Sequence, residues 1–198
     1  MKKQRIYLYV DGSNLYGAQY DLFGPEKYID FAALIKQVEE KIGVHFDKIY
    51  FYASYSPKSK KPTRKEKLYL KNEALFYRSV HRTKNIIFFK GYRSKTSGKE
   101  KEVDVKLTAD LVRDGFQNAY QTVYLFSGDA DFLQALFTIT KLRKKIAIIC
   151  FQNKILFKGS YYFKTYILCV SKIKIGFQQH QRIDFIKLDT SSITKVLS

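Results

Sequence analysis

Short apolar runs alternate with longer amphipathic stretches along most of the chain. The runs are rich in aromatic and β-branched residues, which is typical of buried strands. They predict five strands: Arg5–Val10, Lys48–Ser54, Asn85–Lys90, Thr122–Ser127 and Ile146–Phe151. Asp184–Leu188 is a candidate for a last strand, and the segment DGSNLYG (Asp11–Gly17) is expected to be a turn.

The amphipathic stretches have the 3.6-residue period of helices. They predict four helices: Tyr28–Ile42, Pro62–His81, Val103–Phe116 and Asp131–Lys141. In the first, apolar residues share one face and Gly43 is placed to end the helix. In the third, the apolar positions spaced i, i+4, i+7 and i+11 are Val105, Ala109, Val112 and Phe116. Gly91–Lys101 is polar and basic and is expected to be a loop. Strands alternating with helices predict an α/β fold, with a parallel sheet covered on both faces.

The length of 198 residues suits one domain. We expect a core over about residues 5–151 and a C-terminal part, 152–198, whose placement the pattern does not define. Hydrophobic residues make up 45% of the chain, too many for a disordered one. No run approaches the roughly 18 apolar residues of a membrane helix, and the N-terminus lacks the apolar stretch of a signal peptide. Cys150 and Cys169 form no zinc motif. We therefore expect a reducing, cytoplasmic location, with Cys150 as a buried thiol.

Charge changes the picture, because Lys and Arg number 36 against 18 Asp and Glu, a formal net charge of +18. Such a chain attracts polyanions: nucleic acid is the first candidate and an anionic membrane surface the second. A merely solvated, Lys-rich surface is the alternative. Three basic stretches stand out: Lys58, Lys60, Lys61, Arg64, Lys65 and Lys67; Lys90, Arg93, Lys95, Lys99 and Lys101; and Lys141, Arg143, Lys144 and Lys145. Nearby tyrosines could stack unpaired bases, although most aromatic residues are buried in protein cores; these tyrosines are Tyr55, Tyr69, Tyr92, Tyr161 and Tyr162.

The few acidic residues are placed where chemistry is expected. Asp11 follows the first strand, Asp129 and Asp131 follow the fourth in SGDADF, and Asp104 begins a helix. Ligands of open parallel sheets bind at the carboxyl ends of the strands. Each Asp has a structural alternative as a turn residue, a helix cap or a first-turn acid. Together, however, these carboxylates would repel one another without a cation, and Mg²⁺ suits such oxygen ligands. On a basic protein this favours hydrolysis of a phosphodiester.

Three ordered motifs carry a family resemblance. They are VDGSNL at Val10–Leu15, KEVDV at Lys101–Val105 with Asp110 after it, and LFSGDADF at Leu125–Phe132. Over roughly residues 5–151 the chain resembles the NYN domains, PIN-like nucleases related to flap and 5′-exonucleases. The resemblance implies a PIN-like three-layer α/β/α fold with a central, mostly parallel sheet. It also implies ribonuclease activity that depends on Mg²⁺ or Mn²⁺.

Carried over residue by residue, the resemblance implies metal ligands at Asp11, Asp104, Asp129 and Asp131. These four and Asn14, which would orient the first acid or the scissile phosphate, form the expected catalytic set. Ser127 matches a hydroxyl residue beside the acids, and Lys101 a basic residue before the second acid. Asp110 lies ~120° around an ideal helix from Asp104, so we expect it behind the ligands or on the helix surface. Two positions depart from the family pattern. Glu102 stands where the family often has a small residue, and the segment KLRKKIAI lacks the Gly that usually precedes the fifth strand.

The leading hypothesis is therefore a metal-dependent ribonuclease, endonucleolytic on single-stranded or structured RNA. The resemblance favours RNA over DNA. The expected nucleic-acid contacts are Lys58, Lys60, Lys61, Arg64, Arg93, Lys95, Lys99 and Lys101. The alternative is a non-catalytic RNA-binding module that retains the PIN-like fold. A phosphotransfer domain fits less well, because no second acid stands close to Asp11 in the sequence.

Overall fold

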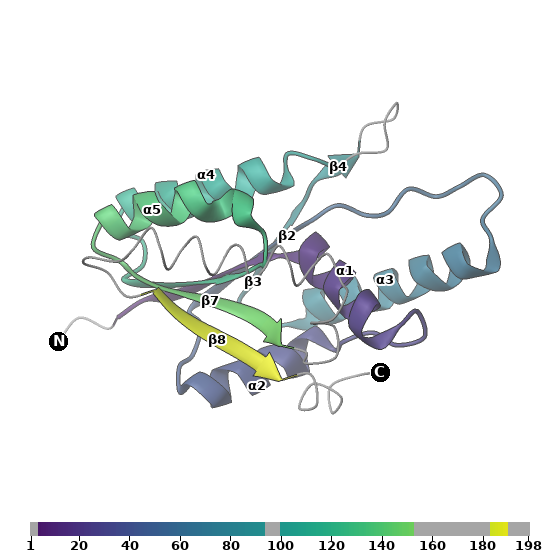
Figure 1. The fold of residues 1–198 in the computed structure, drawn as a ribbon, viewed down its shortest axis with the longest axis horizontal. Coiled ribbons are helices and arrows are strands. Elements are labelled where there is room, and N and C mark those ends of the chain that lie inside the picture. The colour runs from purple at the N-terminus through teal and green to yellow at the C-terminus, as the bar shows by residue number, and fades with distance from the viewer. Residues whose placement is uncertain (1–3, 94–99, 153–182, 190–198) are drawn as a thin grey trace.

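The main sheet has six strands, all parallel, in the order β3-β2-β1-β6-β7-β8 (Figure 1). The computed structural model describes residues 4–93, 100–152 and 183–189. The strands are β1 Ile6–Asp11, β2 Lys48–Ala53, β3 Ile86–Lys90, β6 Thr122–Phe126, β7 Lys145–Gln152 and β8 Ile183–Asp189. The five strands expected from the sequence are thus confirmed, and so is the last candidate strand, which pairs with β7.

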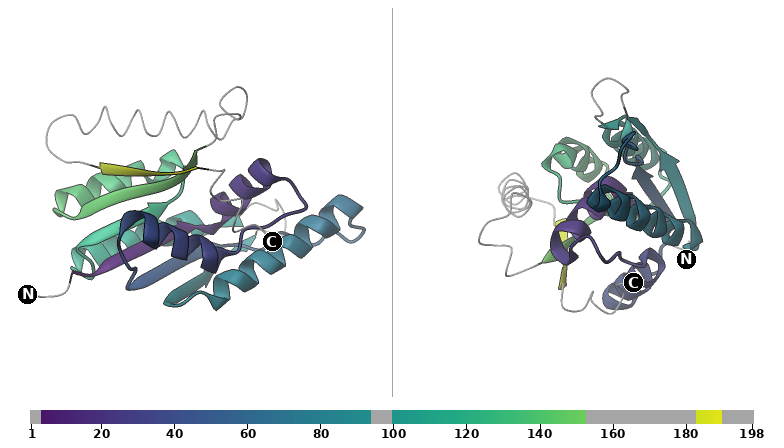
Figure 2. Two further views of the ribbon diagram at one scale, coloured as in Figure 1. Left: turned by 90° about the horizontal axis from the view of Figure 1, so that it is seen from below. Right: turned by 90° about the vertical axis from the view of Figure 1, so that its right-hand side faces the viewer.

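Helices cover both faces of this sheet, which gives the expected three-layer α/β/α fold. One layer is formed by α1 Gly12–Phe23, α2 Phe31–Ile42 and α3 Arg64–Arg82, and the other by α4 Val103–Phe116 and α5 Leu133–Lys141. Side chains alternate along β1: Leu8 and Val10 join the core under the first layer, whereas Tyr7 and Tyr9 join the core under the second. This alternation follows from the two-residue period of a strand. Figure 2 shows the layers from two further directions.

The segment Asp11–Gly17 is not a turn, contrary to the expectation from its sequence. Asp11 caps α1, and its Oδ1 accepts a hydrogen bond from the Asn14 backbone N–H at 3.0 Å. Gly12 begins the helix against β2: a Cβ added there would lie 2.2 Å from Cε1 of Phe51. The cap and this close approach outweigh the weak helical propensity of Gly, Ser and Asn. As a result, the chain turns from β1 into α1 without an intervening loop.

The polar segment before α4 contains strand residues that the sequence did not suggest. Tyr92–Arg93 forms β4 and pairs antiparallel with β5, Glu100–Lys101. The residues between them, 94–99, lie outside the described part, and so do Tyr161–Val170 and Lys172–Arg182. Among the described residues, no helix is long and apolar enough to cross a membrane. Cys150 is buried as expected, whereas Cys169 lies outside the described residues.

Most of the apolar stripe from which α4 is predicted faces solvent, although Val112 packs against the core. Val105 is 74% exposed and Phe116 65% exposed. The buried face of α4 carries Leu107 and Leu111 beside the carboxylates of Asp110 and Asp114. A second apolar period, offset from the first, therefore decides which side packs on the sheet, and it carries two acidic side chains into the interior.

This orientation predicts that two truncations on the same helix change stability by very different amounts. Leu111→Ala should lower the free energy of unfolding by about 2–5 kcal/mol, because it leaves a cavity in the core. Val105→Ala, the matched control on the exposed stripe, should change it by less than ~0.5 kcal/mol. Urea unfolding of both variants measures the difference. A larger loss from Val105→Ala would mean that α4 is rotated about its axis.

Candidate functional site

The strand order reverses between β1 and β6. From β1 the chain builds outward through β2 and β3, then crosses to β6 and builds outward the other way through β7 and β8. Connections leave such a point in opposite directions, and open parallel sheets bind ligands there, in the crevice expected beyond the carboxyl ends of the two central strands. Asp11 is the last residue of β1 and Ser127 directly follows β6. The first and third sequence motifs therefore meet at this crevice.

Asp11 is held from two directions. Its carboxylate caps α1 through Oδ1, while Oδ2 accepts a hydrogen bond from the Ser127 hydroxyl at 3.0 Å. The residue is 3% exposed. Asp30 provides a comparison within the same molecule: it caps α2 in the same way, through the Ala33 N–H, but is only half-buried. The cap reading of Asp11 is thus confirmed, and its burial and its second partner go beyond what a cap requires.

The hydrogen bonds continue from Asp11 through the segment after β6. The Ser127 hydroxyl accepts from the Asp129 N–H at 3.1 Å, and Oδ1 of Asp129 accepts from the Asp131 N–H at 3.0 Å. Oδ1 of Asn14 accepts from the Gly128 N–H at 3.3 Å. The structure therefore brings Asp11, Asn14, Ser127 and Asp129 together. Asp131 is linked to them through its backbone and is exposed, at the start of a 3₁₀ turn, Ala130–Phe132.

Asp104 lies at the same edge of the sheet as Asp11, in the first turn of α4. The register of α4 shows this, because Asp110 bonds Tyr52, the residue that pairs with Asp11, whereas Asp114 bonds Tyr9, two residues earlier in β1. The helix thus runs antiparallel to the strands. Asp104, in its first turn, lies ~9 Å along the helix axis from Asp110, on the side of the strand ends. Asp104 is exposed.

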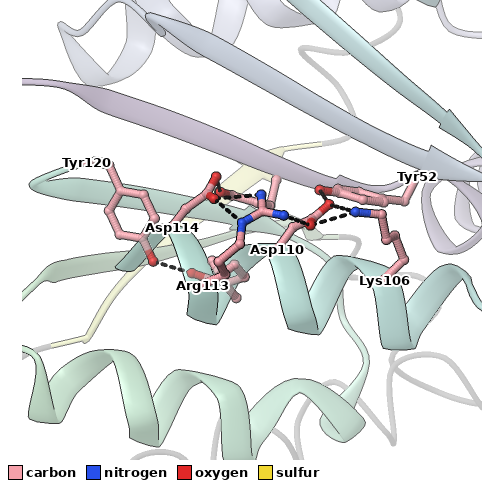
Figure 3. Close-up of polar contacts among 8 residues, drawn as sticks. Tyr52, Lys106, Asp110, Arg113, Asp114 and Tyr120 are labelled. Atoms are coloured by element: carbon pink, nitrogen blue, oxygen red, sulfur yellow. Dashed lines mark hydrogen bonds and ion pairs between the residues drawn. The ribbon is translucent and has the colours of Figure 1, made fainter. Parts of the chain in front are cut away.

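Asp110 belongs to a polar network on the face of the sheet, in which the carboxylates are buried and the cations are partly exposed (Figure 3). It accepts a hydrogen bond from the Tyr52 hydroxyl at 2.9 Å and ion pairs with Lys106 at 2.6 Å and Arg113 at 2.8 Å. These partners occupy its carboxylate, and Asp110 is buried rather than on the helix surface. The expectation that it stands behind the proposed ligands stays a prediction.

Asp114 completes the network, and sequence reasoning missed it. It accepts from the Tyr9 hydroxyl at 2.7 Å and from Arg113, whose Nη2 lies 2.7 Å from Oδ1. One signal was available. Tyrosines alternate along β1 and β2 at Tyr7, Tyr9, Tyr50 and Tyr52, and buried phenol groups need acceptors on the covering helix.

The oxygen atoms at the crevice fit a hard divalent cation. Among the described residues, no three His, Cys, Asp or Glu side chains come close enough to hold a metal ion on their own. Mg²⁺ does not require such a cage, because it commonly binds one or two carboxylates and takes its other ligands from water and substrate phosphate. Asp11 and Asp129, joined through Ser127, offer carboxylates of this kind.

Two of the three basic stretches lie at the edge that holds Asp11. Lys58, Lys60, Lys61 and Arg64 are exposed on the connection from the end of β2 into α3, which projects beyond the strand ends in Figure 1. Lys90 ends β3, and its Nζ lies 4.6 Å from the Tyr55 ring centroid. The third stretch precedes β7, at the opposite edge. Lys95 and Lys99 lie outside the described residues, whereas Arg93 is in β4 and Lys101 is in β5.

Comparison with known proteins gives one family and a shared fold. The model of the NYN domain matches residues 5–160. No curated protein matches. A solved structure of a protein of unknown function from Vibrio parahaemolyticus is similar with a TM-score of 0.59 and 19% identity, covering 94% of each chain. A short-chain dehydrogenase/reductase from Burkholderia vietnamiensis gives a TM-score of 0.43 at 10% identity, covering 94% of this chain and 83% of that one.

Ser127→Ala tests the link between the two motifs. It removes a buried donor to Asp11 and the acceptor of the Asp129 N–H, which should cost about 1–3 kcal/mol in the free energy of unfolding. Ser59→Ala, an exposed serine, is the matched control and should change stability by less than ~0.5 kcal/mol. Urea unfolding of the two variants would contradict the link if their midpoints were equal.

The tyrosine network predicts loss of stability in alkali. Burial, reinforced by Asp114, raises the pKa of Tyr9 and raises that of Tyr50 to about 12, and burial with Asp110 raises the pKa of Tyr52. Above pH ~10 the unfolded chain loses phenol protons that the folded chain keeps, so stability falls as pH rises from ~10 towards 12. Urea midpoints between pH 9 and 12 measure this fall. Tyr50→Phe should make it less steep, and ionisation of every tyrosine near pH 10 in folded protein would contradict it.

Proposed function

We propose that this chain, which belongs to the NYN domain family of PIN-like nucleases, is a metal-dependent ribonuclease whose reaction takes place at the crevice between β1 and β6. The observation that supports the proposal most is the hydrogen-bonded chain from Asp11 through Ser127 to Asp129. It joins two motifs 116 residues apart at the position where parallel sheets bind ligands. RNA is the proposed substrate in preference to DNA.

In this proposal Asp11, Asp104, Asp129 and Asp131 hold Mg²⁺ or Mn²⁺. When bound, such a cation would polarise the phosphodiester and make a water available for attack near neutral pH. Asp11 and Asp129 are the inner pair, since Ser127 fixes both of them. Asp104 and Asp131 are exposed at the same edge, and in the proposal they would complete the set of acids that holds the cation.

Asn14 positions the scissile phosphate. Its Oδ1 accepts from the Gly128 N–H, which leaves the amide Nδ2 as the donor of that side chain. A donor at the start of α1 also lies at the positive end of the helix dipole, where a phosphate oxygen is favoured. The basic residues Lys58, Lys60, Lys61 and Arg64 then hold the backbone of the strand further along, by contacts that carry little sequence information.

The proposal predicts that Asp129→Asn abolishes cleavage while the fold is retained. The asparagine keeps an Oδ1 acceptor for the Asp131 N–H but removes one negative charge. Cleavage of labelled RNA in Mn²⁺ should fall by at least roughly 100-fold, since loss even of an outer partner of a metal costs 10–100-fold. RNA affinity should hold or rise, because a negative charge beside the phosphate path is gone.

A second readout of the same variant does not depend on activity. Mn²⁺ should raise the melting temperature of the wild type and not that of Asp129→Asn, because a ligand that binds only the folded state stabilises it. Asp47→Asn is the matched control: Asp47 also accepts one backbone N–H, that of Ile6, but at the opposite edge of the sheet. Wild-type protein that binds several RNAs yet cleaves none in either metal would establish the RNA-binding module instead.

A further inference from the structure

A pocket of about 240 Å³ lies between α1, α3 and the connection that joins β2 to α3. Two tyrosine rings form part of its wall, Tyr20 from α1 and Tyr69 from α3, with centroids 5.2 Å apart and planes inclined by 65°. Tyr16 supports this wall from α1: its hydroxyl donates to the Tyr69 carbonyl oxygen at 3.0 Å, and the two rings meet at 5.1 Å. The aromatic surface is therefore fixed before any ligand arrives.

The remaining lining is mixed: Ser56 and Ser59 are polar, Pro57 and Leu70 are apolar, Lys65 is cationic and Glu66 is anionic. Ser56 is held at one side, where its hydroxyl donates to Glu73 at 2.6 Å and its N–H bonds the same carboxylate. Glu66 is held by Thr63 in a capping box at the start of α3. Lys65 lines the pocket, and the exposed Lys60, Lys61 and Arg64 precede it directly in the chain. An aromatic wall with a cationic rim matches a nucleobase and its adjoining phosphate.

The size and position of the pocket limit what can occupy it. Its volume lies just below the usual range of small-molecule sites, ~300–1,000 Å³, so it suits a single ring system. Tyr20 stands nine residues after Asp11 on the same helix, which corresponds to ~13 Å along the helix axis. A strand that crosses the Asp11–Asp129 crevice can therefore reach the pocket within a few nucleotides.

We propose that this pocket binds one unpaired base of the RNA strand, stacked against Tyr20 and Tyr69, a few nucleotides from the bond that is cleaved. The proposal rests on the proposed ribonuclease function for the identity of the strand. It adds that the substrate must be single-stranded at this position, because a base held inside a duplex cannot enter the pocket.

The test is an abasic scan with binding as its readout. Fluorescence anisotropy in EDTA gives the affinity for a single-stranded RNA oligonucleotide just long enough to span the Asp11–Asp129 site and the pocket, which restricts it to one register, and for versions that lack one base at successive positions. In the wild type, one position or two adjacent ones should weaken binding by roughly 5- to 150-fold, the range that corresponds to loss of one base–aromatic stacking contact by substitution of the aromatic residue. In Tyr69→Leu, intact RNA should bind as weakly as the sensitive abasic RNA does to the wild type, and the scan should be flat.

Two further variants guard against an effect of misfolding. Tyr20→Leu should reproduce the flat scan from the other wall of the pocket. Tyr28→Leu removes a half-buried tyrosine outside the pocket and should keep the wild-type scan. Melting temperatures of all three show which variants are folded under the conditions of the assay.

The outcomes separate this inference from the function on which it rests. A flat scan for the wild type, or wild-type affinity in both pocket variants, would overturn the base pocket and leave the ribonuclease proposal intact. A position-specific loss in the wild type that both pocket variants abolish supports the pocket, and it does so even if Mn²⁺-dependent cleavage is never observed, in which case only the nuclease proposal fails. Wild-type protein that binds no RNA at all would overturn both.

Discussion

The hydrogen bonds from Tyr9 to Asp114 and from Tyr52 to Asp110 fix where α4 lies on the sheet. A buried phenol without an acceptor is costly, and a buried carboxylate without a donor or cation costs more. Each group therefore needs the other, and Arg113 joins the two carboxylates on the helix. Asp110 and Asp114 lie four residues apart on α4, so their bonds to these two tyrosines set both the rotation and the register of the helix. The placement of Asp104 at the edge that holds Asp11 follows from that register.

At the crevice, too, one side chain has two structural partners: the carboxylate of Asp11 bonds both α1 and Ser127. Asp11 acts first as a helix cap, and the cap is what lets β1 pass directly into α1. Its other oxygen, Oδ2, accepts a hydrogen bond from the hydroxyl of Ser127, which follows the neighbouring strand β6. A residue that satisfies local backbone geometry is thereby placed, buried and oriented, where a cation and a phosphate can approach from the carboxyl ends of the strands. The structural and the functional readings of this aspartate are therefore compatible.

In the proposed function, metal binding and RNA binding take place at two different parts of the same edge of the sheet. The carboxylates occupy the central crevice, while exposed basic residues lie on the connection from β2 to α3 and lead into α3. Lysine and arginine attract any nucleic acid through its phosphates and so bring affinity without selection. In the proposal, the tyrosine-walled pocket beside α3 adds a contact that only an unpaired base can make. Together they favour a substrate strand that is unpaired on one side of the cleaved bond.

The sequence by itself determined the strands of the main sheet, the four helices it predicted and the family, because these depend on local periodicity and on ordered motifs. It did not reveal α1, since Gly-Ser-Asn has little helical propensity and the cap and the contact with Phe51 that outweigh it are set by the fold. It offered two apolar stripes on α4, and only packing against Tyr9 and Tyr52 decided that Leu107 and Leu111 face inward. Likewise it named Asp11, Asn14, Ser127 and Asp129 as candidates, but their contacts join segments more than 110 residues apart. Such contacts depend on where strands lie side by side, which the tertiary structure alone decides.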